Sequence, residues 1–194
     1  LTTWTACSGV GSTSANYPRN SASSGSYIVS SLASPTQPLI YTSDGITFNS
    51  VGGSFATFPK ASAIAFGNGV WVSLSSLTGT AGEQAYIANV NPAGAWAVGA
   101  STNIGMTTVN AIAYGNGVFV AVGVSASAGA GKIATSANPA SGWVDRTAAS
   151  GLSFSANYGA VDVVFDGSLF WLIGTCGLAK SSNGINWTVV TNCP

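Results

Sequence analysis

The chain has 194 residues, of which 46% are hydrophobic and only 5% are charged, with five basic residues, five acidic residues and no histidine. A zero net charge gives no electrostatic attraction to nucleic acid or to anionic lipid, and the lack of histidine excludes Ser-His-Asp and Cys-His catalytic arrangements. No apolar run reaches the ~18 to 20 residues of a membrane-spanning helix, so we expect neither nucleic-acid binding nor membrane insertion.

The polar part of the sequence is mostly Ser, Thr, Asn and Gly, a composition that we associate with extracellular or assembled proteins. Low charge also leaves little repulsion between copies, which favours self-association. The chain begins at Leu1 without a basic and hydrophobic leader. We therefore expect a mature exported chain, secreted or at the cell surface, whose signal peptide has been removed.

The first predicted strand covers residues 1–9, LTTWTACSG. It resembles the end of the chain, residues 185–193, INWTVVTNC, and residues 142–151, GWVDRTAASG. Each of these segments places an aromatic residue at the same point, and Trp4 is the one in residues 1–9. The segment therefore looks like one strand of a repeating unit, placed before the first complete unit.

A phrase of two short apolar runs recurs along the chain. It is AIAFGNGVWVSL in residues 63–74, AIAYGNGVFVAVG in residues 111–123, and more loosely VDVVFDGSLFWLIG in residues 161–174. Alternating apolar residues rich in β-branched and aromatic types predict strands, and Asn-Gly or Asp-Gly between them predicts a tight hairpin turn. We interpret every glycine of the two GNG triplets as a turn glycine. The predicted turn residues are Asn68 and Gly69, Asn116 and Gly117, and Asp166 and Gly167.

A second phrase follows each hairpin: IYTSDGITF in residues 40–48 and AKSSNGINW in residues 179–187, with longer variants in residues 86–96 and 132–143. Each again predicts a strand, a turn and a strand. Asp and Asn side chains stabilise such turns by accepting hydrogen bonds from the backbone two residues further on. The turn residues expected to do so are Asp44 with Gly45 and Asn183 with Gly184.

Two hairpins make a unit of four antiparallel strands, and repeats of about 40 to 50 residues of this kind predict propeller blades. We expect an all-β fold: a small four-bladed propeller in residues 10–194, with blades at about 20–50, 63–98, 111–146 and 161–190, plus an extra N-terminal strand in residues 1–9.

The two phrases together resemble the Asp-box repeat of bacterial neuraminidases and related β-propellers. The best local match is Ser43, Asp44, Gly45, Thr47 and Phe48, and the next is Ser182, Asn183, Gly184 and Trp187, where Asn replaces Asp. The other two copies insert residues around Asn-Pro and lack the motif. The resemblance implies a propeller fold of secreted, cell-surface or phage type; the box stabilises a turn and implies no activity.

The extra strand has no slot in a closed four-bladed ring, because the last blade already supplies its own fourth strand. An unpaired outer strand is a template for pairing with another chain. We hypothesise that residues 1–9, including Thr3, Trp4 and Thr5, join copies by strand exchange. A fifth strand packed on its own blade, or a segment of a longer propeller, would explain it equally well.

The three cysteines, Cys7, Cys176 and Cys193, are predicted to project to one face of the propeller. In an exported protein they can oxidise, and an odd number leaves at least one without an intramolecular partner. Pairing of Cys176 with Cys193 would lie within one blade, whereas pairing of Cys7 with Cys193 would clamp the termini within or between chains. Without histidine or a CxxC spacing, we expect no metal and no cofactor.

Few side chains in this sequence are candidates for a catalytic role. The acids that could act on a glycosidic bond are better explained as turn residues. Asp145 and Arg146 are expected to be solvated or to be partners of other strands, and two arginines, Arg19 and Arg146, are too few for a sialidase site. Four tryptophans recur at one position of the repeat and are expected to pack between blades. Trp71 and Trp171 lie in the second strand of their units, where Phe119 and Ile28 are the equivalents, and are expected to be core or inter-sheet residues. The recurrent tryptophans are Trp4, Trp96, Trp143 and Trp187.

We therefore expect a non-enzymatic, structural subunit of a secreted homopolymer, such as an extracellular filament, whose main partner is itself. The alternative is a carbohydrate- or surface-binding propeller module of adhesin or phage type, with glycans as partners.

Overall fold

The computed structural model describes residues 18–32, 39–51, 61–75, 84–101, 106–125, 130–140, 142–154 and 159–191. The predicted strand in residues 1–9, with Thr3, Trp4, Thr5 and Cys7, lies outside these residues, as does Cys193.

Four antiparallel sheets of four strands each make up the described chain, as the repeat predicts. The first holds β1 (Pro18–Ser23), β2 (Ile28–Leu32), β3 (Leu39–Thr42) and β4 (Asn49–Ser50). The second holds β5 (Ala61–Gly67), β6 (Val70–Ser75), β7 (Gln84–Asn89) and β8 (Ala97–Ser101). The third holds β9 (Met106–Gly115), β10 (Val118–Ser125), β11 (Gly131–Asn138) and β12 (Gly142–Asp145). The fourth holds β13 (Ala160–Phe165), β14 (Phe170–Gly174), β15 (Gly177–Ser181) and β16 (Thr188–Thr191).

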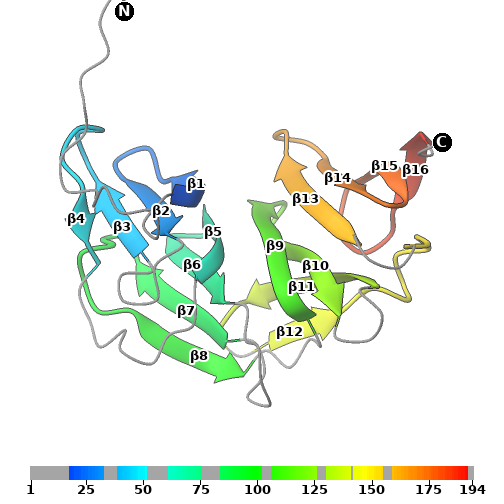
Figure 1. Ribbon diagram of the computed structural model, residues 1–194, viewed down its shortest axis with the longest axis horizontal. Helices are drawn as coiled ribbons and strands as arrows, with labels where there is room; N and C mark the ends of the chain where they lie inside the picture. The colour runs from blue at the N-terminus through cyan, green and yellow to red at the C-terminus, as the bar shows by residue number, and fades with distance from the viewer. Residues whose placement is uncertain are drawn as a thin grey trace, which may run out of the picture.

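The sheets follow one another along an arc, with the first and the fourth sheet at its two ends (Figure 1). The first strand of each sheet contacts the first strand of the next, so β1 lies against β5, β5 against β9 and β9 against β13. No comparable contact joins the described residues of β1 and β13. The blade-like sheets are therefore as predicted, whereas a closed ring is not seen.

Each sheet has two faces, because side chains alternate along a strand. We call the face turned toward the next sheet in the chain the forward face, and the face turned toward the preceding sheet the backward face. Three apolar cores result, one at each junction. The forward face of the third sheet, for example, packs Val120, Val122 and Ile133 against Phe170 and Leu172 on the backward face of the fourth.

A tilted aromatic pair marks the backward faces of the second, third and fourth sheets beside the first hairpin turn. The ring centroids of each pair lie 4.7 to 4.8 Å apart, in the tilted geometry that aromatic rings favour. The pairs are Phe66 with Trp71, Tyr114 with Phe119, and Phe165 with Phe170.

Two glycines of the GNG triplets have a different role from the one predicted. Gly69 and Gly117 do have the positive φ of a tight turn, with Asn68 and Asn116 before them. Gly67 and Gly115 instead lie under an aromatic ring of the next sheet: a Cβ on Gly67 would lie 2.0 Å from the Tyr114 ring, and one on Gly115 would lie 2.3 Å from the Phe165 ring. Close approach of two sheets requires glycine there.

The recurrent tryptophans pack between sheets, as predicted, wherever the structure describes them. Trp96 and Trp187 are buried and Trp143 is half-buried against the core of its junction. Each indole N–H donates to a nearby backbone carbonyl: Pro92 for Trp96, Pro139 for Trp143 and Gly184 for Trp187. A buried indole with its single donor satisfied adds apolar area without an unpaired polar group.

We predict that Gly115→Ala lowers the free energy of unfolding by about 1 to 3 kcal/mol, the usual cost of inserting a methyl group into a packed core. Gly142→Ala is the matched control, since its Cβ would meet its nearest described neighbour, the Asn138 carbonyl oxygen, only at 3.7 Å. Denaturant unfolding measures both. The loss should shrink in a Phe165→Ala background; an equal loss in both backgrounds would contradict the ring contact.

Candidate functional site

The forward face of the fourth sheet stands at one end of the arc with no following sheet among the described residues. Its side chains are those of Asp162, Val164, Trp171, Ile173, Leu178 and Lys180. We call this set the end face. Except for Lys180, these residues line a shallow groove of about 170 Å³.

The end face differs sharply in exposure from the same face of the third sheet. Val164 and Ile173 are each 52% exposed, whereas their equivalents by strand register, Ala113 and Val122, are 8% and 0% exposed. The pattern of the repeat is thus apolar here too, but nothing in the described chain covers it. A contiguous exposed apolar patch on an otherwise polar surface marks an interaction site.

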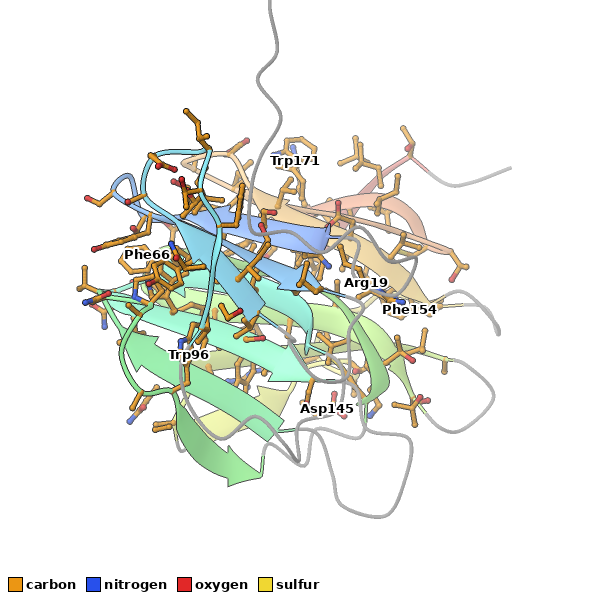
Figure 2. The ribbon with its side chains drawn as sticks, turned by 60° about the vertical axis from the view of Figure 1, so that its left-hand side comes forward. Arg19, Phe66, Trp96, Asp145, Phe154 and Trp171 are labelled. Atoms are coloured by element: carbon orange, nitrogen blue, oxygen red, sulfur yellow. The ribbon has the colours of Figure 1, made fainter. Side chains whose placement is uncertain are left out.

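Trp171 was expected to be buried at the position of Trp71, and this expectation is wrong. The register pairs Trp171 with Val164, as it pairs Val120 with Ala113, so Phe170 is the residue equivalent to Phe119 and Trp71. A shift of one residue moves a side chain to the other face of a strand. Trp71 is 0% exposed in the core, whereas Trp171 is half-buried on the end face; Figure 2 labels its indole at the last sheet.

Asp166 holds the Trp171 side chain at the edge of this face. The Trp171 indole N–H donates to Oδ2 of Asp166 at 2.6 Å, and Oδ1 accepts from the Leu169 and Ser168 amides at 2.8 Å. The Leu169 amide, then the Trp171 indole and the Ser168 amide, keep the pKa of Asp166 below its usual value. The carboxylate is charged at neutral pH and orients the indole.

A second groove lies at the opposite end of the arc, on the first sheet. It has a volume of about 260 Å³ and lies where the β1–β2 turn meets the β3–β4 turn. Its lining includes Ser23, Tyr27, Ile28, Thr42 and Gly45. Ile28 is 40% exposed on the backward face of this sheet, whereas Leu32 and Ile40 on the same face are buried.

The two Asp-box-like turns have the same hydrogen bonds in the first and the fourth sheet. Oδ1 of Asp44 accepts from the amides of Ile46 at 2.8 Å and Thr47 at 2.7 Å, and from the Thr42 hydroxyl at 2.9 Å. Oδ1 of Asn183 accepts from the amides of Ile185 and Asn186 at 2.9 and 3.0 Å. Gly45 and Gly184 both have positive φ.

The Thr47 and Ile46 amides, with the Thr42 hydroxyl, lower the pKa of Asp44 to about 2. Oδ1 of Asp44 and Oδ1 of Asn183 are both committed to the turn itself. These side chains therefore shape the loops.

Asn116 links the third sheet to the fourth. Its Nδ2 donates to the carbonyl oxygens of Ser168 at 3.2 Å and Ser182 at 2.8 Å, which belong to the two turns of the next sheet. Asn110 makes a similar link deeper in the junction, to the Ala160 carbonyl at 2.7 Å. The side chain that begins a hairpin turn thus also fixes the neighbouring sheet.

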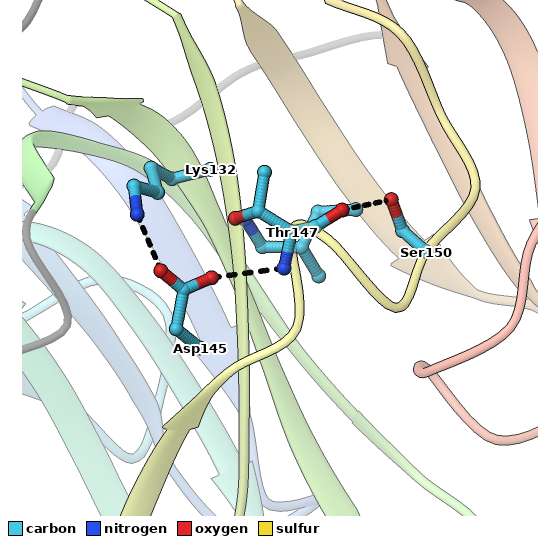
Figure 3. A network of polar contacts seen from close by, with 5 residues as sticks. Lys132, Asp145, Thr147 and Ser150 are labelled. Atoms are coloured by element: carbon cyan, nitrogen blue, oxygen red, sulfur yellow. Dashed lines mark hydrogen bonds and ion pairs between the residues drawn. The ribbon is translucent and has the colours of Figure 1, made fainter.

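The charged residues of the third sheet pair with one another and with turn backbone (Figure 3). Asp145 forms an ion pair with Lys132 and accepts from the Thr147 amide at 2.8 Å, and Arg146 donates to the Thr135 hydroxyl at 3.0 Å. Burial raises the pKa of Asp145, but the bonds from Lys132 and Thr147 outweigh it and the pKa lies below its usual value. Both side chains serve neighbouring strands, one of the two interpretations offered above.

Cys176 is buried in the core between the third and the fourth sheet, at the β14–β15 turn. The partners proposed for it, Cys7 and Cys193, lie outside the described residues, so the pairing stays a prediction. Within the described ranges, no three His, Cys, Asp or Glu side chains gather as metal ligands. None of the described segments is a helix long and apolar enough to cross a membrane.

No protein-family model matches this sequence, and no curated protein matches it. Solved structures do match. A chain of a nidogen/laminin complex is similar with a TM-score of 0.59 and 11% identity, over 85% of this chain and 59% of that one. The GH74 xyloglucanase of Xanthomonas campestris has a TM-score of 0.57 and 16% identity, over 84% of this chain and 27% of that one.

A thermostable family-43 glycoside hydrolase is similar over 98% of this chain and 76% of its own, with a TM-score of 0.55 and 9% identity. At such low identity these matches show the fold alone: an all-β, propeller-like arrangement of antiparallel sheets. The chain spans about three-fifths of the nidogen/laminin chain and about a quarter of the xyloglucanase. The resemblance to the Asp-box repeat in particular remains a prediction.

We predict that Asp44→Asn is less stable than the unaltered chain at pH 6 and equally stable at about pH 1, below the pKa of both the folded and the unfolded chain. A pKa of about 2 in the folded chain, against about 4 when unfolded, means that the charged carboxylate stabilises the fold above pH 4. That contribution is lost as the pH falls through 2. Thermal unfolding at a series of pH values measures it.

Asn183→Asp is the reciprocal control, because it places a carboxylate in the equivalent turn of the fourth sheet. It should gain stability at pH 6 and lose the gain in acid. Stability differences that do not change with pH in either variant would contradict this account of the turns.

Proposed function

We propose that this protein is a structural subunit that associates with copies of itself into an extracellular polymer. The end face carries this proposal. Val164, Ile173 and the half-buried Trp171 occupy positions that are covered by the next sheet everywhere else in the described chain. Burying such a face gains about 25 cal/mol for each Å² removed from water, and a copy of the same chain offers a matching sheet.

Low charge supports the same proposal. With five basic and five acidic residues in 194, long-range repulsion between copies is weak. Several of these charges are held within the subunit: Lys132 by Asp145 and Asp166 by Trp171 and two backbone amides. Charge therefore does little to oppose association of the apolar faces.

Strand exchange by residues 1–9 is the second element of the proposal. The segment matches the fourth strand of the repeat in sequence, and the fourth sheet already has β16 in that place. A donated edge strand adds backbone hydrogen bonds to an interface. With cysteines at positions 7 and 193, the joined termini can be cross-linked in an oxidising environment.

We propose no catalytic activity. Asp44 and Asp166 are engaged in their own turns, and Asp145 is engaged by Lys132 and Thr147. Paired carboxylates for glycoside hydrolysis must face one another across a sugar. Asp162 and Asp166 are the two described acids that share a sheet, and Asp162 accepts from the Val163 amide while Asp166 is engaged by its turn and by Trp171. The likeness to glycoside hydrolases is one of fold.

Glycan binding is the alternative function, and the exposure of Trp171 favours it. A half-buried indole fixed by Asp166 beside a shallow groove is a flat apolar platform with polar groups at its rim, the kind of surface that ligand sites use. A glycan array probed with the unassembled subunit tests this.

Sedimentation velocity over a concentration series tests self-association, and negative-stain electron microscopy shows its form. We expect species larger than one chain that increase with concentration, and fibres at high concentration. Deletion of residues 1–9 should weaken or shorten the assemblies, whereas an assembly unchanged by that deletion would rule out strand exchange. A single-chain species at every concentration would rule out the structural role.

A further inference from the structure

We infer that two copies pair through their end faces, related by a two-fold axis that places Asp162 of each copy opposite Lys180 of the other. This inference rests on the proposed self-association and names its interface. It comes from the size and the charge of the side chains that distinguish the end face from the forward faces of the other sheets.

The end face is bulkier than the other forward faces at two positions. Where the fourth sheet has Trp171, the strand register places valine in the other three, and where it has Val164, the others have alanine. Small side chains let a forward face receive the large side chains of the next sheet, so the end face does not fit a further backward face of the same kind. The valines are Val29, Val72 and Val120, and the alanines are Ala22, Ala65 and Ala113.

The end face also carries one charge of each sign. Asp162 and Lys180 are both exposed there, whereas the third sheet has Ala111 and Thr135 at the same register positions. Neither charged side chain forms an ion pair with another described residue. A face with one acid and one base can match a second copy of itself, because each charge can meet its opposite.

The two charges lie at diagonally opposite corners of the face. The strand register arranges the six side chains in two rows across β13, β14 and β15: Val164, Trp171 and Lys180 in one row, and Asp162, Ile173 and Leu178 in the other. Asp162 therefore lies on β13 in one row, and Lys180 lies on β15 in the other.

This arrangement selects one orientation of the two-fold axis. An axis along the strands would place Asp162 over Leu178 of the other copy, and an axis across the strands would place it over Val164 of the other copy. An axis in the plane of the interface, at right angles to the line between the charged corners, places Asp162 opposite Lys180 twice, once on each side. We infer that the copies adopt this last orientation, because a charge facing an apolar side chain is unfavourable.

The same rotation matches the apolar side chains. At the usual spacings of strands and of residues along them, it places Trp171 nearest to Val164 of the other copy, and Ile173 nearest to Leu178 of the other copy. The pairing would remove from water Val164 and Ile173, which are each 52% exposed. The hydrogen bond to Asp166 already fixes the indole, so little side-chain freedom remains to be lost on association.

The pair closes on itself, since a two-fold contact uses the same surface of both copies. Six side chains from each copy are few beside the roughly 20 to 30 residues a side of a standard interface, so we expect pairing only at micromolar or higher concentrations. Growth beyond two copies then needs a second contact, for which strand exchange by residues 1–9 is the candidate.

Charge reversal tests the inference. Asp162→Lys places lysine opposite lysine in both contacts, and Lys180→Asp places aspartate opposite aspartate. Both positions are exposed, so both variants should fold. In sedimentation velocity we expect each to associate at least about tenfold more weakly than the unaltered chain, because like charges face one another twice. Ser43→Lys and Ser43→Asp, in the exposed β3–β4 turn of the first sheet, are the controls for altered net charge and should associate normally.

Combining the two reversals decides the arrangement. A mixture of Asp162→Lys with Lys180→Asp should recover a pair with one copy of each, because every lysine then faces an aspartate. The chain with both changes should pair with itself as the unaltered chain does. Recovery in these two cases is the result expected only where the two positions face one another across a two-fold axis.

Three outcomes would overturn the inference. Normal association of both single variants, or failure of the mixture and of the double variant to recover, would exclude the two-fold pairing and leave self-association standing. Loss of glycan binding by Trp171→Ala, with association unchanged, would assign the end face to a sugar instead. An unaltered chain that never associates would overturn the pairing together with the structural function.

Discussion

Face-to-face packing of successive sheets is the constraint on which this structure depends. Every sheet is apolar on both faces, so a single sheet would expose one apolar face even when the other is covered. The chain solves this by repetition: each forward face of small residues, such as Ala113 and Val120, receives a backward face of large ones, such as Phe165 and Phe170. Packing large side chains against small ones allows the sheets to approach closely. The same arrangement is seen where a ring of the next sheet lies over Gly67 and over Gly115.

The turns supply what the packing cannot, which is the alignment of one sheet on the next. Asp44 and Asn183 close their turns with side-chain hydrogen bonds to backbone amides, and Asn116 extends from its own turn to two turns of the neighbouring sheet. These bonds use amide and hydroxyl groups more than charge. They explain how a chain with 5% charged residues can hold its loops in place.

The repeat period and the Asn-Gly turns predict the four sheets because both are local properties of the chain. Ring closure is not local, and the sequence pattern of β13 is as apolar as that of β9, although one of its faces is exposed. Trp171 shows most clearly what the sequence pattern leaves open. Alternation of apolar residues fits either of two strand registers that differ by one residue, and only the observed pairing of Trp171 with Val164 places the indole outside the core. The close contact over Gly115 also depends on a residue 50 positions away, Phe165, which no turn rule includes.

Solenoid and other repeat proteins usually end in a repeat with a polar outer face, which keeps the array soluble. A fourth sheet that served as such a cap would carry polar residues where this one carries Val164, Trp171 and Ile173. Its forward face instead keeps the apolar pattern of the repeat, and its side chains at two positions are larger than those of the other three sheets. The opposite end of the arc differs, because Leu32 and Ile40 on the backward face of the first sheet are only 2% and 1% exposed. The described chain therefore exposes an apolar sheet face at the end formed by the fourth sheet, and the self-association that we propose would bury that face.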